Sequence, residues 1–521
     1  MFQLILKKHY PLIIFVCAYL LFGLFMFRRL PVTNDEEYRY SRGADLLHHF
    51  TSDNLNQFKI LNQPNVNNFV YSGYTVVLNL FIPGLYYDYF HLLNFIFALP
   101  IFIVVYLLVY DFSKNKFVAT GACLSLALFP GFSGHIGINT EDIPFAISYL
   151  IAIYAIIHLS VGNLSANNVV SRDTPAFSSK RTLPRIFLLG LLFGFSQSLR
   201  QVGFTLYIIL VAHDVFYFKG NIRAVLQRMW EYFFIFVIAN FFMVITWPNF
   251  AINYFRNMYL YLVLGKDYSL WNHQILFMGQ LIDKYQRPFY YLPLLQLITY
   301  PVYILLFFIL SLFLAKRLLK NRTYFVLFFT FMLNYLMYFL LKPVIYDGIR
   351  HYLFLAPILV IMASICFIEF ISLVKNIWVK RFTFVIVLLG FALSAYKTFV
   401  MFPYEYFYFN ELSRVFGNPY VQFDSDYFAA TYKDAALWIR DTYVANMIPA
   451  IKPTVYSCDG AFEVSYYSKG KFYITTNRAK ADLIICDYKS MLTRNYTGDI
   501  IHKVVVDDNI LNFVLKVTPT K

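Results

Sequence analysis

Residues 11–38, PLIIFVCAYLLFGLFMFRRLPVTNDEEY, decide the fold, because an uncharged apolar run at 11–27 is followed closely by the acids Asp35 and Glu36. A run of this length predicts one helical crossing of a lipid bilayer. Many further apolar runs follow, so this one is a retained crossing and not a cleaved signal peptide. Adjacent carboxylates just outside a crossing suit a catalytic base at the membrane surface. The alternative is a solvated acidic turn that caps a helix.

The composition excludes an ordinary soluble protein. The 521 residues are 59% hydrophobic and only 14% charged, and a soluble chain of this length carries far more charge. The net charge of +15 is spread over short loops between apolar runs, which is a sign of membrane topology and not of a nucleic-acid partner. Cys458 and Cys486 fall in the polar C-terminal region and could pair if that region is extracytoplasmic.

The apolar segments predict about eleven crossings. They lie near residues 11–27, 91–110, 117–132, 143–160, 186–200, 203–218, 230–248, 290–315, 323–341, 351–373 and 381–400. With the N-terminus in the cytoplasm, the inside loops carry the basic clusters at 7–8, 114–116, 172–185, 219–228, 316–322 and 375–381. This is the positive-inside pattern. The other face then holds a first outer loop, 28–90, a large outer loop, 249–289, and everything after about residue 401.

Two domains follow from this pattern. Residues 1–400 form an all-α transmembrane domain, and residues 401–521 form a small extracytoplasmic α/β domain. In the second domain, Asp424 and Asp426 can cap a helix that runs to about Tyr443. Short strands are predicted at 453–458, 471–475, 481–486 and 501–506.

Ionisable side chains gather at the outer ends of the predicted crossings, where charge is costly and is a functional hypothesis by default. On the same face as Asp35 lie His91, His135, Asn139, Asp142, Arg200, Lys284, Arg287, Arg350 and His351. Acids beside cations at one membrane face suggest a substrate with an anionic head and a lipid tail. Cations would hold a phosphate, and an acid would take a proton from an acceptor.

Each of these residues has a purely structural alternative. His91 could be a packing residue, and Asp142 could cap the fourth crossing. Arg200 could extend to the lipid headgroups, and Lys284 and Arg287 could be ordinary surface charges. Arg350 could form a structural ion pair with Asp347.

An ordered set of motifs extends over about residues 10–440. It includes Asp35-Glu36, His91-Leu-Leu-Asn94, Phe129-Pro-Gly-Phe-Ser-Gly-His135 with Asn139-Thr-Glu-Asp-Ile-Pro-Phe145, the glycine-rich run ending at Arg200, Tyr346-Asp-Gly-Ile-Arg-His-Tyr352 and Phe402-Pro-Tyr-Glu-Tyr-Phe-Tyr-Phe-Asn410. The set resembles bacterial members of the dolichyl-phosphate-mannose-protein mannosyltransferase family, glycosyltransferase family 39, which has the GT-C membrane fold. Gly131, Glu141 and Phe428 depart from the family pattern, which has Arg, Lys and Trp there, and these departures bear on the acceptor more than on the reaction.

The resemblance implies transfer of a sugar from a polyprenyl-phosphate-sugar donor, with inversion, on the extracytoplasmic face. The family's catalytic acid maps onto Asp35, and Glu36 would orient the acceptor or a neighbouring loop. We expect a second acid or acceptor group among Asp142, His135 and Asn139. The candidates for binding the donor phosphate are Arg200, Arg350, His351, Lys284, Arg287 and His91.

Several points stay open at this stage. The acceptor could be a glycan, a lipid or a protein, and no nucleic acid is expected. No cofactor is certain, and metal dependence is undecided, because a divalent cation could bind the oxygens of Asp35, Glu36 and Asp142. A lipid or sugar transporter is the alternative function, and it predicts inverted repeats with charges near the middle of the membrane. The abundance of Phe, Tyr, Lys and Asn suggests an AT-rich genome and hence a bacterial inner membrane.

Overall fold

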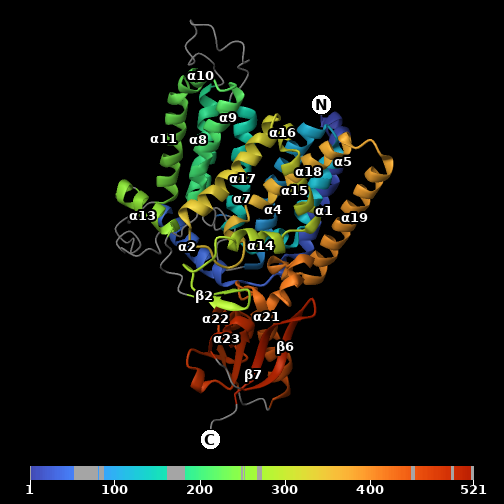
Figure 1. Cartoon of the computed structure of the whole chain (residues 1–521). Helices are drawn as coiled ribbons and strands as arrows, with labels where there is room; N and C mark the ends of the chain where they lie inside the picture. The colour runs from blue at the N-terminus through green and yellow to red at the C-terminus, as the bar shows by residue number, and fades with distance from the viewer. Residues whose placement is uncertain are drawn as a thin grey trace.

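The computed structural model describes residues 2–51, 80, 87–160, 182–247, 250, 253–266, 273–447, 452–494 and 498–517. A bundle of helices forms the larger part of the molecule, and a small mixed sheet with its helices lies beyond one end of the bundle (Figure 1). The predicted fold class, an all-α polytopic membrane protein with a small C-terminal α/β domain, is confirmed.

Eight helices in the described residues are long and apolar enough to cross a membrane. They are α1 (Phe2–Met26), α4 (Tyr87–Ser113), α7 (Asp142–Leu159), α8 (Thr182–Leu199), α11 (Met229–Thr246), α17 (Arg322–Leu341), α18 (Leu355–Leu373) and α19 (Ile377–Met401). Each corresponds to one of the predicted crossings.

The other three predicted crossings differ. Residues 117–132 fold as α5 (Lys116–Ala127) and α6 (Pro130–Ile136), which meet at 74°. Extended backbone at Arg200 separates α8 from η5 (Gln201–Phe204) and α9 (Thr205–Tyr217). Pro301 divides 290–315 into α14 (Tyr291–Thr299) and α15 (Val302–Phe313). The described residues therefore hold eight helices that are each long and apolar enough to cross a membrane, or nine if α5 and α6 form one span, and the shorter apolar helices Gln201–Tyr217 and Val302–Phe313 in the other two predicted crossings.

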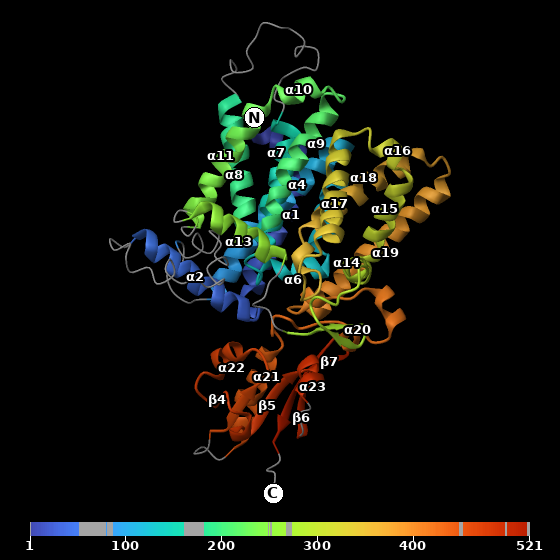
Figure 2. The ribbon, with the colours of Figure 1, turned by 60° about the vertical axis from the view of Figure 1, so that its left-hand side comes forward.

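The end of the bundle nearest the C-terminal domain is covered by short elements. These are α2 (Asn34–Thr51), α13 (Tyr254–Lys266) and the antiparallel pair β1 (Ile275–Phe277) and β2 (Gln280–Ile282). Figure 2 shows α2 and α13 lying beside this end of the bundle. They occupy parts of the two predicted outer loops, and the remainder of those loops includes residues outside the described ranges.

After α19 the chain forms the short helices η7 (Glu405–Phe407), η8 (Glu411–Phe416), α20 (Pro419–Gln422) and α21 (Tyr432–Trp438). The helix predicted from Asp424 and Asp426 thus starts later. Asp426 instead accepts the backbone N–H groups of Ala430 and Thr431, at 2.8 and 3.0 Å, because its carboxylate is occupied by the turn that precedes α21.

The C-terminal sheet has the order β4-β3-β5-β7-β6. Its strands are β3 (Thr454–Ser457), β4 (Tyr473–Thr475), β5 (Leu483–Asp487), β6 (Asp499–Val506) and β7 (Asn509–Lys516), with helices α22 (Ala461–Ser468) and α23 (Tyr488–Arg494). All four predicted strands are present, and β7 was not predicted. β3 runs parallel to β4 and β5, and a disulfide joins Cys458 to Cys486.

The opposite end of the bundle carries a buried ionic cluster of its own. Arg228 pairs with Asp214 at 2.7 Å and with Glu231 at 2.8 Å, and Arg185 pairs with Glu231 at 2.7 Å. These contacts tie together α8, α9 and α11 where they leave the bundle. The helices α10 (Ile222–Leu226) and α16 (Ala315–Leu318), from two of the basic clusters, lie at this same end in Figure 1.

Candidate functional site

A cavity of about 550 Å³ lies between the bundle and the C-terminal domain. Its walls come from the first turns of α2, the turn before α7, the link after α8, residues 343–352, residues 424–427 and the C-terminal domain. Among the side chains predicted for a site, Asp35, Arg200, Arg350 and His351 line this cavity.

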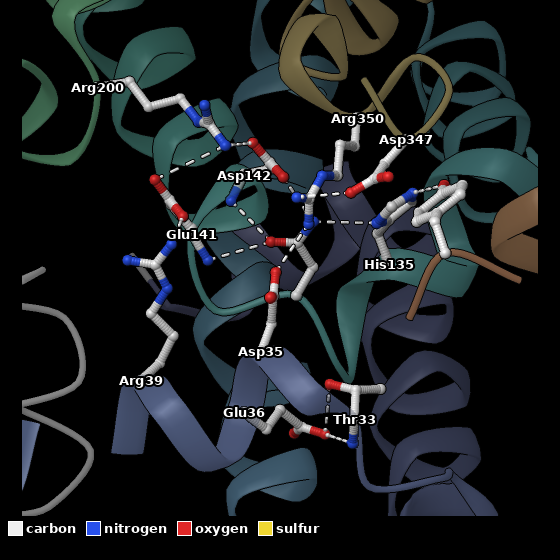
Figure 3. Close-up of polar contacts among 12 residues, drawn as sticks. Thr33, Asp35, Glu36, Arg39, His135, Glu141, Asp142, Arg200, Asp347 and Arg350 are labelled. Atoms are coloured by element: carbon white, nitrogen blue, oxygen red, sulfur yellow. Dashed lines mark hydrogen bonds and ion pairs between the residues drawn. The ribbon is translucent and has the colours of Figure 1, made fainter. Parts of the chain in front are cut away.

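Arg350 joins two carboxylates in the cavity wall (Figure 3). Its Nη1 lies 2.7 Å from Oδ2 of Asp35, and its Nη2 lies 2.8 Å from Oδ2 of Asp347. Asp347 and Gly348 both have positive φ angles, 56° and 67°. This left-handed turn returns Asp347 to the side of Arg350, and glycine adopts it at no steric cost.

The two carboxylates bound to Arg350 differ in pKa. Burial would raise the pKa of Asp35, but the guanidinium groups of Arg350 and Arg39 outweigh it, so the pKa of Asp35 lies below its usual value. At Asp347 burial prevails over the attraction of Arg350 and raises the pKa to about 7. At neutral pH Asp35 is therefore a carboxylate that can accept a hydrogen bond, whereas Asp347 is partly protonated.

A second group of charges lies beside the first. Glu141 pairs with Arg39, which is one helical turn after Asp35, and lies 3.7 Å from Nη2 of Arg200. Arg200 also pairs with Asp142, whose side chain is 3% exposed. Figure 3 shows Arg200 directed at both of these carboxylates. Burial would raise the pKa of Glu141, but Arg39 and Arg200 outweigh it and lower that pKa.

Asp142 is held by a chain of buried side chains behind the cavity wall. Nδ2 of Asn139 donates to Oδ2 of Asp142 at 2.8 Å and lies 3.0 Å from Nδ1 of His135. Nε2 of His135 lies 3.1 Å from the hydroxyl of Tyr427, which lines the cavity. The structure thus brings these three predicted residues together, one layer behind the cavity.

Glu36 lies on the other side of α2 from the cavity charges (Figure 3). Its Oε2 accepts the N–H of Thr33 at 3.0 Å and the hydroxyl of Thr33 at 3.2 Å, and its Oε1 lies 2.9 Å from Nε2 of His91. The side chains of Glu36 and His91 are fully buried. A Glu three residues after a Thr at a helix start is a capping-box arrangement. These contacts fix the start of α2.

Lys284 and Arg287 lie outside the cavity lining. Arg287 donates to the backbone carbonyls of Lys284 and Pro343, at 2.5 and 2.7 Å. It therefore ties the segment before α14 to the chain that leads into the lining residues 343–352. Within that lining, the ring of His351 packs edge-on against Tyr346 with the ring centroids 4.7 Å apart.

Several lining residues were not among the predicted site residues. They include Arg39, Glu141, Asp347 and, from the C-terminal domain, Asp459, Asp487 and Lys489. Nζ of Lys489 lies 2.8 Å from Oδ1 of Asp424. Arg39 could have been found, because it follows Asp35 at the spacing of one helical turn. Nothing in the sequence around Lys489 indicates that a separate domain closes over the site.

The residues present do not fit a preformed metal site. Of the three predicted oxygen ligands, Glu36 is bound to Thr33 and Asp142 to Arg200. The described part of the chain has no group of three or more His, Cys, Asp or Glu side chains placed to hold a metal.

Solved structures share this architecture at low sequence identity. ArnT from Cupriavidus metallidurans bound to undecaprenyl phosphate matches over 96% of this chain and 97% of that chain, with 13% identity and a TM-score of 0.50. An oligosaccharyltransferase from Archaeoglobus fulgidus, tethered to an acceptor peptide, matches over 93% of this chain and 70% of that chain, with 12% identity and a TM-score of 0.46. No family model and no curated protein matches the sequence. The fold is of GT-C type, in a multi-pass membrane protein.

Proposed function

We propose that this protein is a membrane glycosyltransferase that moves a sugar from a polyprenyl-phosphate-sugar donor to an acceptor hydroxyl, with inversion. The observation that carries the proposal is the carboxylate of Asp35, paired with Arg350 at the wall of a cavity at one end of the bundle. In this proposal residues 1–400 form the transferase domain, and the C-terminal domain covers the cavity.

Asp35 acts as the general base. It accepts the proton of the acceptor hydroxyl as that oxygen attacks the anomeric carbon, and the bond from this carbon to the phosphate oxygen breaks on the opposite face. Positive charge develops on the sugar ring, as in other glycosyl transfer, and negative charge develops on the departing phosphate. Fixed cations directed at the position of that charge lower the barrier.

Arg350 and Arg200 stabilise the departing phosphate. Both line the cavity, and each has a buried Nε–H with no hydrogen-bond partner among the described residues. A guanidinium carries five donors, so each can keep its carboxylate partner and still bind a phosphate oxygen. His351 lies in the same lining. Lys284 and Arg287, outside the lining, assist only by supporting the segment that bears Arg350.

The cavity opens on the extracytoplasmic side. The helices α10 and α16 of the basic clusters lie at the other end of the bundle from the C-terminal domain (Figure 1), and such clusters stay in the cytoplasm. The N-terminus is then cytoplasmic and the C-terminal domain extracytoplasmic, in a bacterial inner membrane. The cavity charges also lie at one end of the bundle, which is not the mid-membrane placement that a transporter requires.

A polyprenyl-phosphate-linked donor is supported by two likenesses. The sequence motifs resemble the dolichyl-phosphate-mannose-protein mannosyltransferase family, and the ArnT structure with similar architecture is bound to undecaprenyl phosphate. The acceptor is a glycan, a lipid or a protein that carries a free hydroxyl. No metal is assigned to the reaction.

The release of lipid phosphate tests this function whatever the acceptor is. The purified protein in lipid nanodiscs is incubated with undecaprenyl-phosphate-mannose and sets of oligosaccharide, glycolipid and peptide acceptors. Mass spectrometry measures free undecaprenyl phosphate, and NMR of the product reports its anomeric configuration. We expect acceptor-dependent release and an inverted linkage. A retained linkage would contradict the mechanism. The transporter would be favoured by two results together. No lipid phosphate would be released with this donor or with related undecaprenyl-phosphate sugars, and the protein would move the donor across a bilayer.

A further inference from the structure

The C-terminal domain holds the chain that leads into Asp35. The backbone N–H of Val32 donates to the hydroxyl of Tyr467 at 2.8 Å, across 435 residues of sequence. Tyr467 belongs to α22, which contacts α2, and Figure 2 shows α22 facing the end of α2 that begins at Asn34. Val32 and Thr33 are fully buried. The residues before Asp35 are therefore buried, and one of their peptide groups is bound by the small domain.

Two further contacts hold the same segment. With its amide nitrogen turned toward Glu463, Asn34 donates to the two carboxylate oxygens of Glu463 at 2.7 and 2.8 Å. Nζ of Lys433 donates to the backbone carbonyls of Arg29 and Leu30 at 2.6 and 3.3 Å. Glu463 is fully buried, so its carboxylate has little access to water as an alternative partner.

The bundle holds α2 from the other flank. Glu36 is fixed to Thr33 and faces His91 of α4 at 2.9 Å. Asp35 lies between these two sets of contacts, and its own side chain is 43% exposed, bound to Arg350. Its backbone position is therefore set by its neighbours in the chain, one flank of which is held by residues from the C-terminal domain.

We infer that Tyr467 and Glu463 of the C-terminal domain are positioning residues for Asp35, so that the small domain is a working part of the active site. The inference rests on the proposed function of Asp35 as the base. A general base must lie within hydrogen-bonding reach of the proton that it accepts, and small displacements in a catalytic site cost large factors in rate. The hydroxyl of Tyr467 sets where α2 begins, and hence where the Asp35 carboxylate lies.

The first test needs no substrate. Hydrogen–deuterium exchange is measured on residues 30–36 in nanodiscs for the wild type, Tyr467→Phe and the control Tyr466→Phe, which alters the neighbouring side chain, 39% exposed. Loss of one hydrogen bond should speed exchange of this segment by roughly 2- to 12-fold in Tyr467→Phe. Tyr466→Phe should match the wild type. Unchanged exchange in Tyr467→Phe would overturn the inference, whether or not the protein transfers a sugar.

The second test measures turnover with undecaprenyl-phosphate-mannose and the acceptor that supports release. Tyr467→Phe should lower kcat by roughly 10-fold while the donor KM stays within 2-fold. The acid limb of its kcat–pH profile should move to higher pH. A displaced Asp35 loses contact with Arg350, which otherwise lowers the pKa of Asp35. Faster exchange with wild-type kcat and an unmoved limb would show that Tyr467 does not position the base.

Glu463 supplies a second variant in case Tyr467→Phe folds poorly. Glu463→Gln keeps hydrogen-bonding groups for Asn34 and should retain most of the wild-type kcat. Glu463→Ala should lose most of that kcat, although both variants give equal yields of folded protein. Equal kcat in the Gln and Ala variants would overturn the role of Glu463. A wild type that transfers no sugar would refute the proposed function and leave the exchange result as a test of the contact itself.

Discussion

Nη1 of Arg350 lies 2.7 Å from Oδ2 of Asp35, although 315 residues separate them in sequence. Asp35 opens α2 after the first span, and Arg350 follows the left-handed turn at Asp347 and Gly348. The pair brings the N-terminal part of the transmembrane domain together with its C-terminal part in one cavity wall. The cation also keeps the pKa of Asp35 below its usual value against the opposing effect of burial, so the carboxylate is ionised at neutral pH and ready to accept a proton.

Asp35→Asn should nearly abolish sugar transfer. Asn keeps the shape of the side chain but cannot accept the proton, and loss of a general base typically costs ~10²–10⁴-fold in rate. The variant should still bind the donor, because Arg350 and Arg200 remain. Release of undecaprenyl phosphate and binding of the labelled donor measure the two effects. Glu37→Gln, two residues away, is the control. Wild-type turnover in Asp35→Asn would exclude Asp35 as the base and make Asp142 the next acid to examine.

Glu36→Gln should act on stability more than on chemistry. The Glu36 side chain is buried against Thr33 and His91, and Gln can still accept the N–H of Thr33 but loses the charge opposite His91. A hydrogen bond to a charged group contributes about 1.5–3 kcal/mol. We expect a lower unfolding temperature in detergent, with turnover per folded molecule reduced less than in Asp35→Asn. A stable variant that is as inactive as Asp35→Asn would assign Glu36 a direct role.

The sequence was sufficient to predict the fold class but not where the helices within a predicted crossing break. Long apolar runs such as those of α4 and α18 predict a single helix, and each forms one continuous helix long enough to cross a membrane. The run at 290–315 is as apolar as these, yet Pro301 divides it. The break after α8 lies at Arg200, in extended backbone, where the predicted crossings 186–200 and 203–218 part, so this break was predicted. Hydropathy averages over such positions, and a single backbone angle decides whether one helix or two are formed.

The cavity was partly predictable for a similar reason. The membrane fixes which ends of spans share a face, so the charge pattern could anticipate that Asp35, Asp142, Arg200 and Arg350 lie near one another. It could not separate side chains that line the cavity from those one layer behind it. The contribution of Lys489 depends on how a separate domain docks, which no local pattern records.

The cavity cations should differ from the cations outside it in their effect on the donor. Arg350→Lys and Arg200→Lys keep the charge but lose the planar fork of donors. Loss of one charge-assisted hydrogen bond of about 1.5 kcal/mol corresponds to roughly a 10-fold rise in donor KM. Arg287→Lys is the matched control, because Arg287 donates to backbone carbonyls and does not line the cavity. An equal rise of the donor KM in all three variants would show that Arg350 and Arg200 do not bind the donor.

The orientation of the chain can be tested with single cysteines. Lys471→Cys in the C-terminal domain should react with an impermeant maleimide on intact cells, and Lys320→Cys, in the basic cluster beside α16, should not. Both positions are exposed, and the native Cys17 is replaced first because it is exposed as well. Permeabilised cells should label both variants. If only Lys320→Cys is labelled on intact cells, the chain has the opposite orientation to the one proposed.

Donor affinity should fall as pH rises through about 7, because of Asp347. Burial raises the pKa of Asp347 to about 7, against the attraction of Arg350 and Lys489 and with the help of Asp424 and Asp35. A group with a raised pKa holds its proton below that pH, so Asp347 is neutral in mild acid and Arg350 is then freer to bind the donor phosphate.

Above pH 7 the ionised Asp347 adds a negative charge beside Arg350, and the donor KM should rise by up to roughly 10-fold per pH unit, the limit for release of one proton. The phosphodiester of the donor keeps one negative charge throughout this range and contributes no titration of its own. Asp347→Asn should make the donor KM nearly independent of pH between 6 and 8.5, at a value close to that of the wild type in mild acid. The same rise in Asp347→Asn as in the wild type would assign the pH dependence to another group.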